Sequence, residues 1–453
     1  MTELIEKAGP SVDGRLSHLL AVRGGPPGAQ ANPEAPIVIQ SREALIYTLG
    51  KAAELEHLVL CQYLFAGFSL KRDEGEGLAP DAVPMVQRWR RELSHIAEQE
   101  MLHLALVQNL LTAVGGAPRL GRANFPVPVR SWPADVRMVL LPFGEVALRH
   151  FAFLERPEGM AIADVEQFAA VEKATPLPRP SEDEMAPYLP DFETIGHLYR
   201  AIENGLEHLA DRLGPDRLFI GPPRAQATAE HFGWEELVAV TDLASARRAI
   251  DTIVEQGEGA RGDWKDAHFG RLINILDELL EARDANAAFE PTRPVLAASV
   301  RPPDSGEPVP IITDLFTVRC MDLLNAVYEV LLQLLARYFA HTDETDEQLG
   351  TLADVAVGLM EGAIKTLGNL VTRLPVGPEY PGMTAGPNFE LFYSVDYLLP
   401  HREAAWTLMA ERLREVADLA MRCREVCIPI YMSPLSKVTQ SLRVQADLLV
   451  ADA

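Results

Sequence analysis

The sequence predicts an all-α protein in which a four-helix bundle with long insertions is followed by a second, C-terminal helical unit. Several long segments place apolar residues three or four positions apart, which is the spacing of one helix face. Clusters of glycine and proline separate these segments, as they do at helix ends. Hydrophobic residues make up 48% of the 453 residues, so the chain can fill more than one helical core.

Charge and cysteine content restrict the classes of partner. The formal net charge is −24, which disfavours nucleic acid and anionic membrane because both repel an acidic surface. The four cysteines form no Cys-x-x-Cys pair, so a reducing compartment is expected. The first residues do not resemble a secretory signal, and no apolar run approaches the roughly 18 residues of a membrane span. We therefore expect a cytoplasmic protein with no membrane partner.

The first two bundle helices are the most regular part of the chain. Residues 1–37 are rich in Gly, Pro and Ala and are expected to form an N-terminal arm. A helix is expected over residues 41–70, with Ser41 as its N-cap. A second helix over residues 84–114 should end at Gly115-Gly116, because glycine favours the C-terminal end of a helix.

The remaining bundle helices are expected to be shorter and interrupted. The Pro-rich residues 119–133 are too long for a hairpin turn and predict a crossover connection. The helices expected after it cover residues 142–155, 192–213, 243–256 and 266–283. The last two are parts of one helix, which should break at Gly257-Glu258-Gly259. The bundle as a whole is expected to span residues 38–286.

The C-terminal part is expected to be a separate helical unit. Residues 287–310 contain six prolines and no helical period, which predicts a linker. Residues 311–453 should form the second unit, with helices over 314–341, 344–374 and 401–427. This unit contains no Glu-x-x-His pair. We therefore expect a structural role for it, as a lid or as the surface of a homodimer.

A carboxylate and an imidazole three residues apart identify a candidate metal site in the second helix. Glu100 and His103 lie on one helix face, so both can bind the same ion. Glu56 in the first helix shares the apolar face of Tyr63, which turns it toward the core. A buried carboxylate is costly unless it is paired or binds a metal. The alternative for Glu56 is a salt bridge at the edge of the core.

The third and fourth helices are expected to supply further ligands. Glu203 shares a stripe with Tyr199 and is the inward candidate of the third helix. In the fourth, Glu255 follows an apolar run, but the residue three positions later is Glu258 and not histidine. His268 lies beyond the glycine-rich break. It either returns to the metal or caps the helix that follows.

A dinuclear site in a four-helix bundle needs inward carboxylates from several helices and about two histidines. The expected ligands are Glu56, Glu100, His103, Glu203, Glu255 and His268. Two iron ions, or manganese in their place, suit carboxylate and imidazole ligands. Glu92 and His95 form a rival pair, but the neighbouring Arg90 and Arg91 place it toward solvent. Glu207 and His208 are weaker alternatives in the third helix.

These motifs resemble a known family. The segments Ala53-Glu54-Leu55-Glu56-His57, Glu100-Met101-Leu102-His103 and Glu255-Gln256-Gly257-Glu258-Gly259, with His268-Phe269, resemble the ferritin-like domain of the iminophenyl-pyruvate dimer synthase family. That family is typified by the imine-dimerising enzymes of violacein and related bisindole pathways. The resemblance covers residues 38–285 and implies a ferritin-like bundle with the ligands named above. The named synthases are longer, so it does not extend to oxidative imine coupling or to haem.

The sequence leaves three functions open. The first is a dinuclear iron or Mn/Fe oxidase or oxygenase that activates O2 to oxidise a small molecule of secondary metabolism, with Tyr63 as a catalytic electron donor or hydrogen-bond partner. The second is metal handling, as in a ferroxidase. The third is a non-catalytic interaction protein whose bundle has lost its metal, which the missing second Glu-x-x-His pair motivates.

Overall fold

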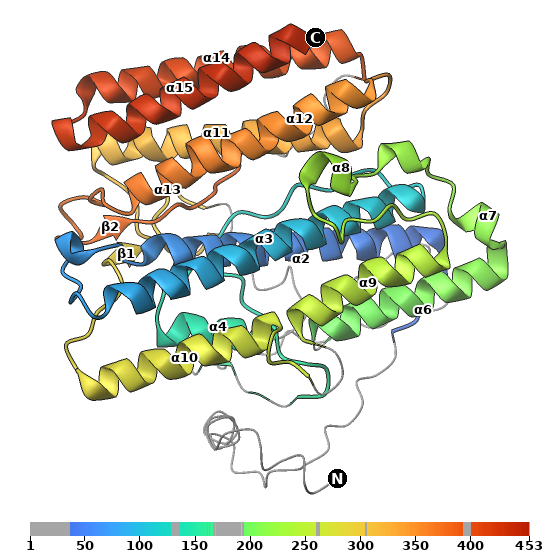
Figure 1. The fold of residues 1–453 in the computed structure, drawn as a ribbon, viewed down its shortest axis with the longest axis horizontal. Helices are drawn as coiled ribbons and strands as arrows, with labels where there is room; N and C mark the ends of the chain where they lie inside the picture. The colour runs from blue at the N-terminus through green and yellow to red at the C-terminus, as the bar shows by residue number, and fades with distance from the viewer. Residues whose placement is uncertain are drawn as a thin grey trace, which may run out of the picture.

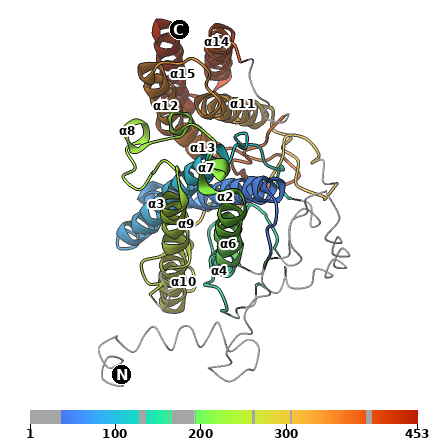
Figure 2. The ribbon, with the colours of Figure 1, turned by 90° about the vertical axis from the view of Figure 1, so that its right-hand side faces the viewer.

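The computed structural model describes residues 37–127, 136–160, 162, 164–165, 168, 192, 194–259, 263–303, 306–392 and 400–452. The expected N-terminal arm, except residue 37, and parts of the expected loops lie outside the described residues. The fold is almost entirely helical and has three layers (Figure 1, Figure 2). Helices α2 (Arg42–Ser69) and α3 (Val83–Ala113) form the middle layer.

The middle layer is an antiparallel pair of long helices. Ser41 accepts the Ala44 N–H at 3.1 Å and so caps α2, as the sequence predicts. Arg42 Nη1 donates to the Val114 carbonyl at 2.6 Å, which joins the start of α2 to the end of α3. Every residue of α2 from Leu55 to Tyr63 is buried. A helix that is buried on all sides lies inside the molecule, and both outer layers pack on this one.

The other two bundle positions are each occupied by two helices in line. Helices α4 (Glu145–Leu154) and α6 (Ile195–Leu213) lie end to end, and so do α9 (Leu243–Gly257) and α10 (His268–Ala285) (Figure 1). The short elements α7 (Pro215–Leu218), η5 (Pro223–Ala225) and α8 (Ala229–Phe232) lie between α6 and α9. The sequence predicts the break between α9 and α10. The break between α4 and α6 differs from the expectation, because residues 142–155 form half of a bundle helix.

The C-terminal layer is a second group of antiparallel helices. Helix α11 (Leu315–Phe339) is followed by α12 (Asp346–Leu359), which continues through one π-turn, η6 (Met360–Ile364), into α13 (Lys365–Val371). Helices α14 (Arg402–Val426) and α15 (Pro429–Asp452) form the outer hairpin. The sequence-based expectation ends at residue 427 and therefore lacks α15, where Pro429 and Pro434 weaken the local signal for a helix. Pro429 is compatible with one, because the first N–H of a helix has no intrahelical partner.

The expected linker is packed between the layers. Strand β1 (Val295–Leu296) pairs in parallel with β2 (Thr384–Ala385). The η3 turn (Glu74–Glu76) follows α2. At the end of α2, the Ser69 carbonyl accepts a hydrogen bond from the Arg293 N–H of the expected linker at 2.9 Å. Val295 is buried. Residues 292–299 therefore join the bundle to the C-terminal unit as a seam and not as a free tether.

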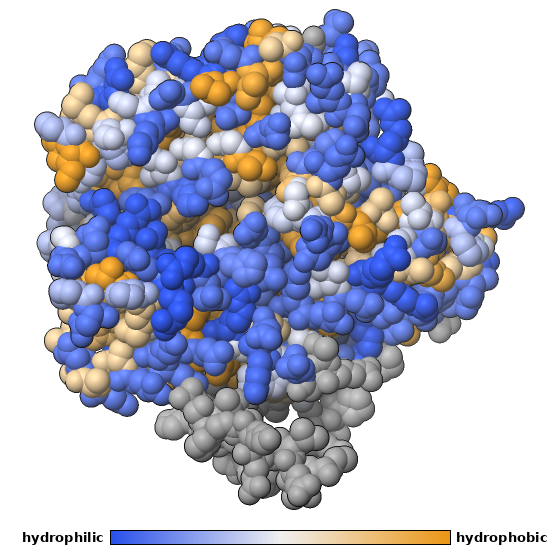
Figure 3. Space-filling view, in the orientation of Figure 1, coloured by the Kyte–Doolittle hydropathy of each residue, from blue (hydrophilic) through white to orange (hydrophobic). Residues whose placement is uncertain are grey.

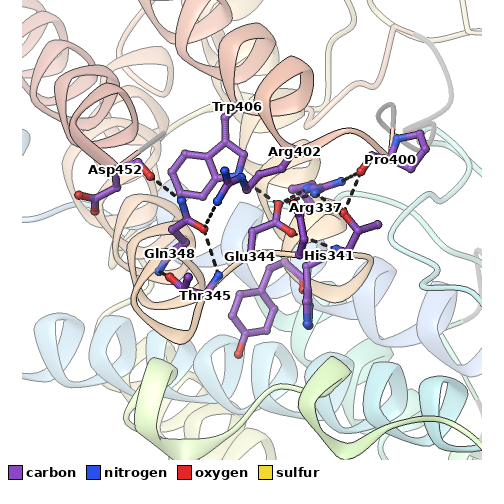
Figure 4. A network of polar contacts seen from close by, with 12 residues as sticks. Arg337, His341, Glu344, Thr345, Gln348, Pro400, Arg402, Trp406 and Asp452 are labelled. Atoms are coloured by element: carbon purple, nitrogen blue, oxygen red, sulfur yellow. Dashed lines mark hydrogen bonds and ion pairs between the residues drawn. The ribbon is translucent and has the colours of Figure 1, made fainter.

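The C-terminal unit has its own buried charged network (Figure 4). Arg337 and Glu344 form an ion pair at 2.5 Å, and both side chains are almost completely buried. Glu344 Oε1 also accepts from Trp406 Nε1 at 3.1 Å, and its other oxygen accepts the Thr342 N–H at 3.0 Å. Arg337 donates in addition to the Pro400 carbonyl at 3.3 Å. Opposite charges therefore meet directly at this point.

Apolar side chains are exposed at the turn between α14 and α15. Val426, Ile428, Ile430 and Met432 each have about half or more of their surface open to solvent, at the left end of the hairpin in Figure 3. The homodimer expected from the sequence stays a prediction. These exposed apolar side chains are a candidate for its interface. Among the described residues, no helix is long and apolar enough to cross a membrane.

Candidate metal centre

The interruptions of the two split helices lie at the same place in the bundle, beside the middles of α2 and α3 (Figure 1). Glu155 is the C-cap of α4, and Tyr199 lies near the start of α6. Gln256 lies in the last turn of α9, and His268 is the first residue of α10. Four helix ends thus bring polar side chains to the bundle interior, where continuous helices would present their apolar faces.

The first group of candidate ligands comes from the two continuous helices. Glu56 of α2 and Glu100 and His103 of α3 are each about 2% exposed, and their donor atoms lie within 4.8 Å of one another. His103 Nδ1 is 3.3 Å from Glu100 Oε2 and 3.6 Å from Glu56 Oε2. The Glu-x-x-His spacing has therefore turned both side chains of α3 to the same side.

The second group shares Glu100 with the first. Glu100, Glu155 and His268 are buried, with donor atoms within 4.8 Å of one another. His268 Nδ1 is 2.9 Å from Glu100 Oε1 and 3.7 Å from Glu155 Oε1. The two oxygens of Glu100 thus face different histidines, as required of a carboxylate that bridges two ions.

An outer ring of side chains repeats around both groups. The Nε2 of His103 lies 3.0 Å from the amide oxygen of Gln256, and the Nε2 of His268 lies 3.2 Å from that of Gln99. An amide oxygen only accepts, so each Nε2 carries the proton. Each Nδ1 is then left to face two carboxylates. The same pattern orients histidine ligands in metal sites, where the nitrogen that binds no metal donates to a neighbouring oxygen.

Two tyrosines complete the ring. Tyr199 donates its hydroxyl to Glu56 Oε1, and Tyr63 donates its hydroxyl to Glu155 Oε1. The site is therefore built as two similar halves around Glu100. One half contains Glu56, His103, Gln256 and Tyr199, and the other contains Glu155, His268, Gln99 and Tyr63.

The electrostatics show that this cluster attracts positive charge. Burial raises the pKa of Glu56 to about 8. Burial disfavours the charged form of His103, but the attraction of Glu100 and contact with Glu56 outweigh it and raise the pKa of His103 to about 10. The pKa of His268 is also raised, because Glu100 and Glu155 outweigh its burial. In the absence of an ion, protons therefore supply the positive charge.

The residues present fit a dinuclear metal centre. Although His268 Nδ1 is close to two carboxylates, it is buried and has no hydrogen-bond partner in suitable geometry. Carboxylate and imidazole donors suit iron and manganese. Three carboxylates carry three negative charges, which two divalent ions would more than balance. Glu56, Glu100 and His103 would hold one ion, and Glu100, Glu155 and His268 the other.

The structure brings together four of the six ligands predicted from sequence: Glu56, Glu100, His103 and His268. It places Tyr63 beside them. It does not bring Glu203 or Glu255 to the cluster. Glu203 is half-buried between α6 and α9, where it lies 3.4 Å from Arg247 Nε. Glu255 is exposed on the outer face of α9.

The physical reason for both corrections is the position of the helix breaks. The site lies beside the first turns of α6, so Tyr199 reaches Glu56, and Glu203, one turn further on, has already passed the site. On α9, the residue that faces His103 is Gln256, and the preceding Glu255 points to solvent. Neither residue is a ligand in this arrangement.

Sequence reasoning missed Glu155. The signal was present, because Leu148, Phe151, Ala152 and Glu155 follow the three- and four-residue spacing of one helix face. The expected helix over residues 142–155 also ends at this carboxylate. The expectation assigns the third bundle helix to residues 192–213, which leaves residues 142–155 without a place in the bundle.

The rival pair in α3 does not form a comparable site. Glu92 pairs with Arg271 at 2.8 Å, and His95 is largely exposed and lies 3.9 Å from Glu98. Only the second of the two Glu-x-x-His pairs in α3 is therefore buried among other metal-binding side chains.

Comparisons with known proteins agree with this architecture. The sequence model of the ferritin-like family matches residues 49–277. The chain is 28% identical over 425 residues to dichlorochromopyrrolate synthase from Lentzea aerocolonigenes, covering 85% of this chain and 39% of that protein. It is 28% identical over 403 residues to 2-imino-3-(indol-3-yl)propanoate dimerase from Chromobacterium violaceum, covering 82% of this chain and 36% of that protein. The chain thus matches well under half the length of these relatives.

A solved structure of a ferritin-like protein from Caulobacter vibrioides is also similar. Its TM-score is 0.42 at 19% sequence identity, and the match covers 70% of this chain and 96% of that chain.

Proposed function

The chain belongs to the ferritin-like family, and on that premise we propose that it is a dinuclear metal oxidoreductase that uses O2 to oxidise a small organic molecule. The proposed cofactor is two iron ions, or manganese together with iron. One observation carries the proposal: both histidines direct Nδ1 toward two buried carboxylates, with Glu100 shared between them. A buried group of this composition needs cations.

The side chains of the site would have distinct roles. Two reduced iron ions, when bound, supply electrons for the reduction of O2. Glu100 would bridge the two positions, and Glu56 and Glu155 would close the opposite ends. Gln256 and Gln99 hold the rings of His103 and His268 so that each Nδ1 faces the carboxylates. Leu55, Val59 and Ile96 precede or follow the ligands on α2 and α3 by a few residues, and all three are buried in the apolar core.

Tyr63 is the proposed catalytic residue. Burial and the neighbouring Glu155 raise the pKa of Tyr63 well above its usual value, so the phenol keeps its proton at neutral pH. That proton lies against Glu155 Oε1, which can accept it. Tyr63 would therefore pass its proton to Glu155 as its electron goes to the metal ions, once O2 has oxidised them. Tyr199 makes the matching contact with Glu56 on the other side of the site.

The relatives suggest a class of substrate. Their names describe a dichlorochromopyrrolate synthase and a dimerase of an indolyl imino acid. We propose an aromatic nitrogen compound of secondary metabolism as the substrate of this chain. The proposal is limited to an oxidation step, because the match covers 39% and 36% of those proteins.

Metal content tests the site. The protein is incubated with Fe(II) without oxygen, freed of unbound metal, and analysed for iron. We expect two ions per chain in the unchanged protein and loss of both in Glu100→Ala, because Glu100 faces both positions. Glu92→Ala is the matched control, since it alters the other Glu-x-x-His pair of the same helix and should keep both ions. Full iron content in Glu100→Ala contradicts the assignment.

Oxygen exposure separates the proposal from metal handling. An oxidoreductase with two resident ions should oxidise about two Fe(II) per chain and then stop when no substrate is present. A ferroxidase would continue through added Fe(II). A protein that stays metal-free in excess iron would instead be a non-catalytic member of the family.

A further inference from the structure

Four arginines come from segments that meet at the left of Figure 1: Arg72 from the α2–α3 turn, Arg90 from the first half of α3, Arg293 from the residues before β1, and Arg373 from the end of α13. Arg293 Nη2 lies 2.8 and 2.7 Å from the two oxygens of Glu76. Arg373 donates to the same carboxylate, and the Arg72 backbone N–H donates to it at 2.8 Å. Arg90 comes from α3; burial and repulsion by Arg72 and Arg293 lower its pKa to about 10.

These guanidinium groups have unused donors. Arg72, Arg90 and Arg293 each have a buried Nε with no hydrogen-bond partner. Within the part of the chain that the structure describes, the side chains of Arg72 and Arg90 donate to no residue. Buried donors without partners cost free energy, so a ligand with acceptor oxygens would stabilise this arrangement.

The charges are also unbalanced. Glu76 is the carboxylate that the group contacts, and Asp73 is the other carboxylate that attracts Arg72 and Arg293. Four guanidinium groups against these two carboxylates leave two positive charges in excess. The excess occurs in a chain whose net charge is −24, so it is not a general property of the surface. The Arg373 side chain is 41% exposed and Arg72 and Arg90 are partly exposed, whereas Arg293 is buried. A small ion would therefore approach the group from the side of Arg72, Arg90 and Arg373.

We propose that Arg72, Arg90, Arg293 and Arg373, grouped around Glu76, form a binding site for a dianionic phosphate group. The planar fork of a guanidinium presents paired N–H donors that match phosphate oxygens. Two negative charges equal the excess, whereas a single carboxylate supplies one. Arg72 and Arg90 belong to the bundle and Arg373 to the C-terminal unit, so a bound phosphate ties the two together.

Equilibrium dialysis against inorganic phosphate tests the site, at constant ionic strength with chloride as the balancing ion. We expect one phosphate per chain, and a dissociation constant at least about tenfold weaker in Arg90→Gln. Arg88→Gln is the matched control, because Arg88 lies on the same helix but pairs with Glu278 at the surface. It should bind phosphate like the unchanged protein.

A second variant and a second probe keep the test decisive. Arg72→Gln should weaken binding in the same way, which covers the case in which Arg90→Gln does not fold. Glycerol phosphate distinguishes a phosphate ester from free phosphate by which of the two binds more tightly. The proposal is overturned if neither probe binds, or if both arginine variants bind phosphate as well as Arg88→Gln.

Discussion

The bundle and the C-terminal unit both bury charged side chains, but they balance the charge in opposite ways. In the C-terminal unit, Arg337 meets Glu344 directly, and Trp406 and Thr342 satisfy the remaining acceptor positions (Figure 4). In the bundle, Glu56, Glu100 and Glu155 face one another across two histidines, and His268 Nδ1 lies 2.9 Å from Glu100 Oε1 without a well-aligned hydrogen bond. The Arg337–Glu344 charges are balanced by residues of the C-terminal unit itself, whereas the charges of the bundle cluster are balanced only with protons or metal ions.

This difference in charge balance indicates which of the two clusters is expected to bind a cofactor. A buried ion pair is stable once formed because each charge has its partner, although it adds little net stability over an apolar pair. A buried excess of carboxylates has no opposite charges within the protein to balance it. We therefore expect the C-terminal network to have a structural role in fixing α11, α12 and α14, and the proposed cofactor to bind at the bundle cluster.

The largest expected effect is on the free energy of unfolding in metal-free protein. Glu344→Gln leaves Arg337 buried without its counter-charge and should destabilise the chain by about 3–5 kcal/mol. Glu56→Gln should change stability by less than about 1 kcal/mol, because the raised pKa of Glu56 keeps it protonated and glutamine is nearly isosteric. Urea unfolding in the presence of a chelator measures both. Equal losses would contradict the contrast between the two regions.

Metal removal should affect the bundle and leave the C-terminal network unchanged. An ion present at about 100 times its dissociation constant adds about 2.7 kcal/mol to the stability of the state that binds it. Addition of a chelator should therefore lower the unfolding midpoint of the unchanged protein but not that of Glu100→Ala. Identical midpoints with and without chelator in the unchanged protein would argue against a bound ion.

The glutamines of the outer ring should tune metal affinity. Gln256→Ala and Gln99→Ala each remove the acceptor that orients one histidine, and outer-ring changes of this kind cost about 10–100-fold in metal affinity. Competition with a coloured chelator measures the loss. Gln108→Ala is a useful control, because Gln108, like Gln99, is a glutamine of α3, but it is fully buried and bonds to the backbone of Arg119. A similar loss in Gln108→Ala would indicate a general packing effect.

The pH dependence of metal binding should follow the raised pKa values. Without metal, Glu56 with a pKa of about 8 and His103 with a pKa of about 10 are both protonated at pH 7. Metal binding must release these protons, so affinity should rise as pH rises from 6 to 8. The slope should be up to about tenfold per pH unit for each proton released. An affinity independent of pH over this range would contradict the assigned protonation.

Much of the architecture follows from local sequence signals. The 3- and 4-residue apolar spacing of α2 and α3, the Ser41 cap and the Gly115-Gly116 stop act within one or two helical turns, and the structure confirms the elements they predict. The all-α ferritin-like fold is confirmed as well. The Glu100–His103 pair was identifiable for the same reason, because three residues on a helix define a common face without any knowledge of the neighbours.

Tertiary structure decided the rest of the site. Glu203 and Glu255 satisfy the local rule for inward carboxylates, yet the helix breaks move them away from the site. Glu155 shares the apolar face of a short helix, but local spacing does not assign that helix to the bundle. His268 joins the cluster because the α9–α10 break places the first residue of α10 beside Glu100. Periodicity determines which face of a helix is buried, but the position along the helix at which two elements meet depends on packing between segments far apart in the chain.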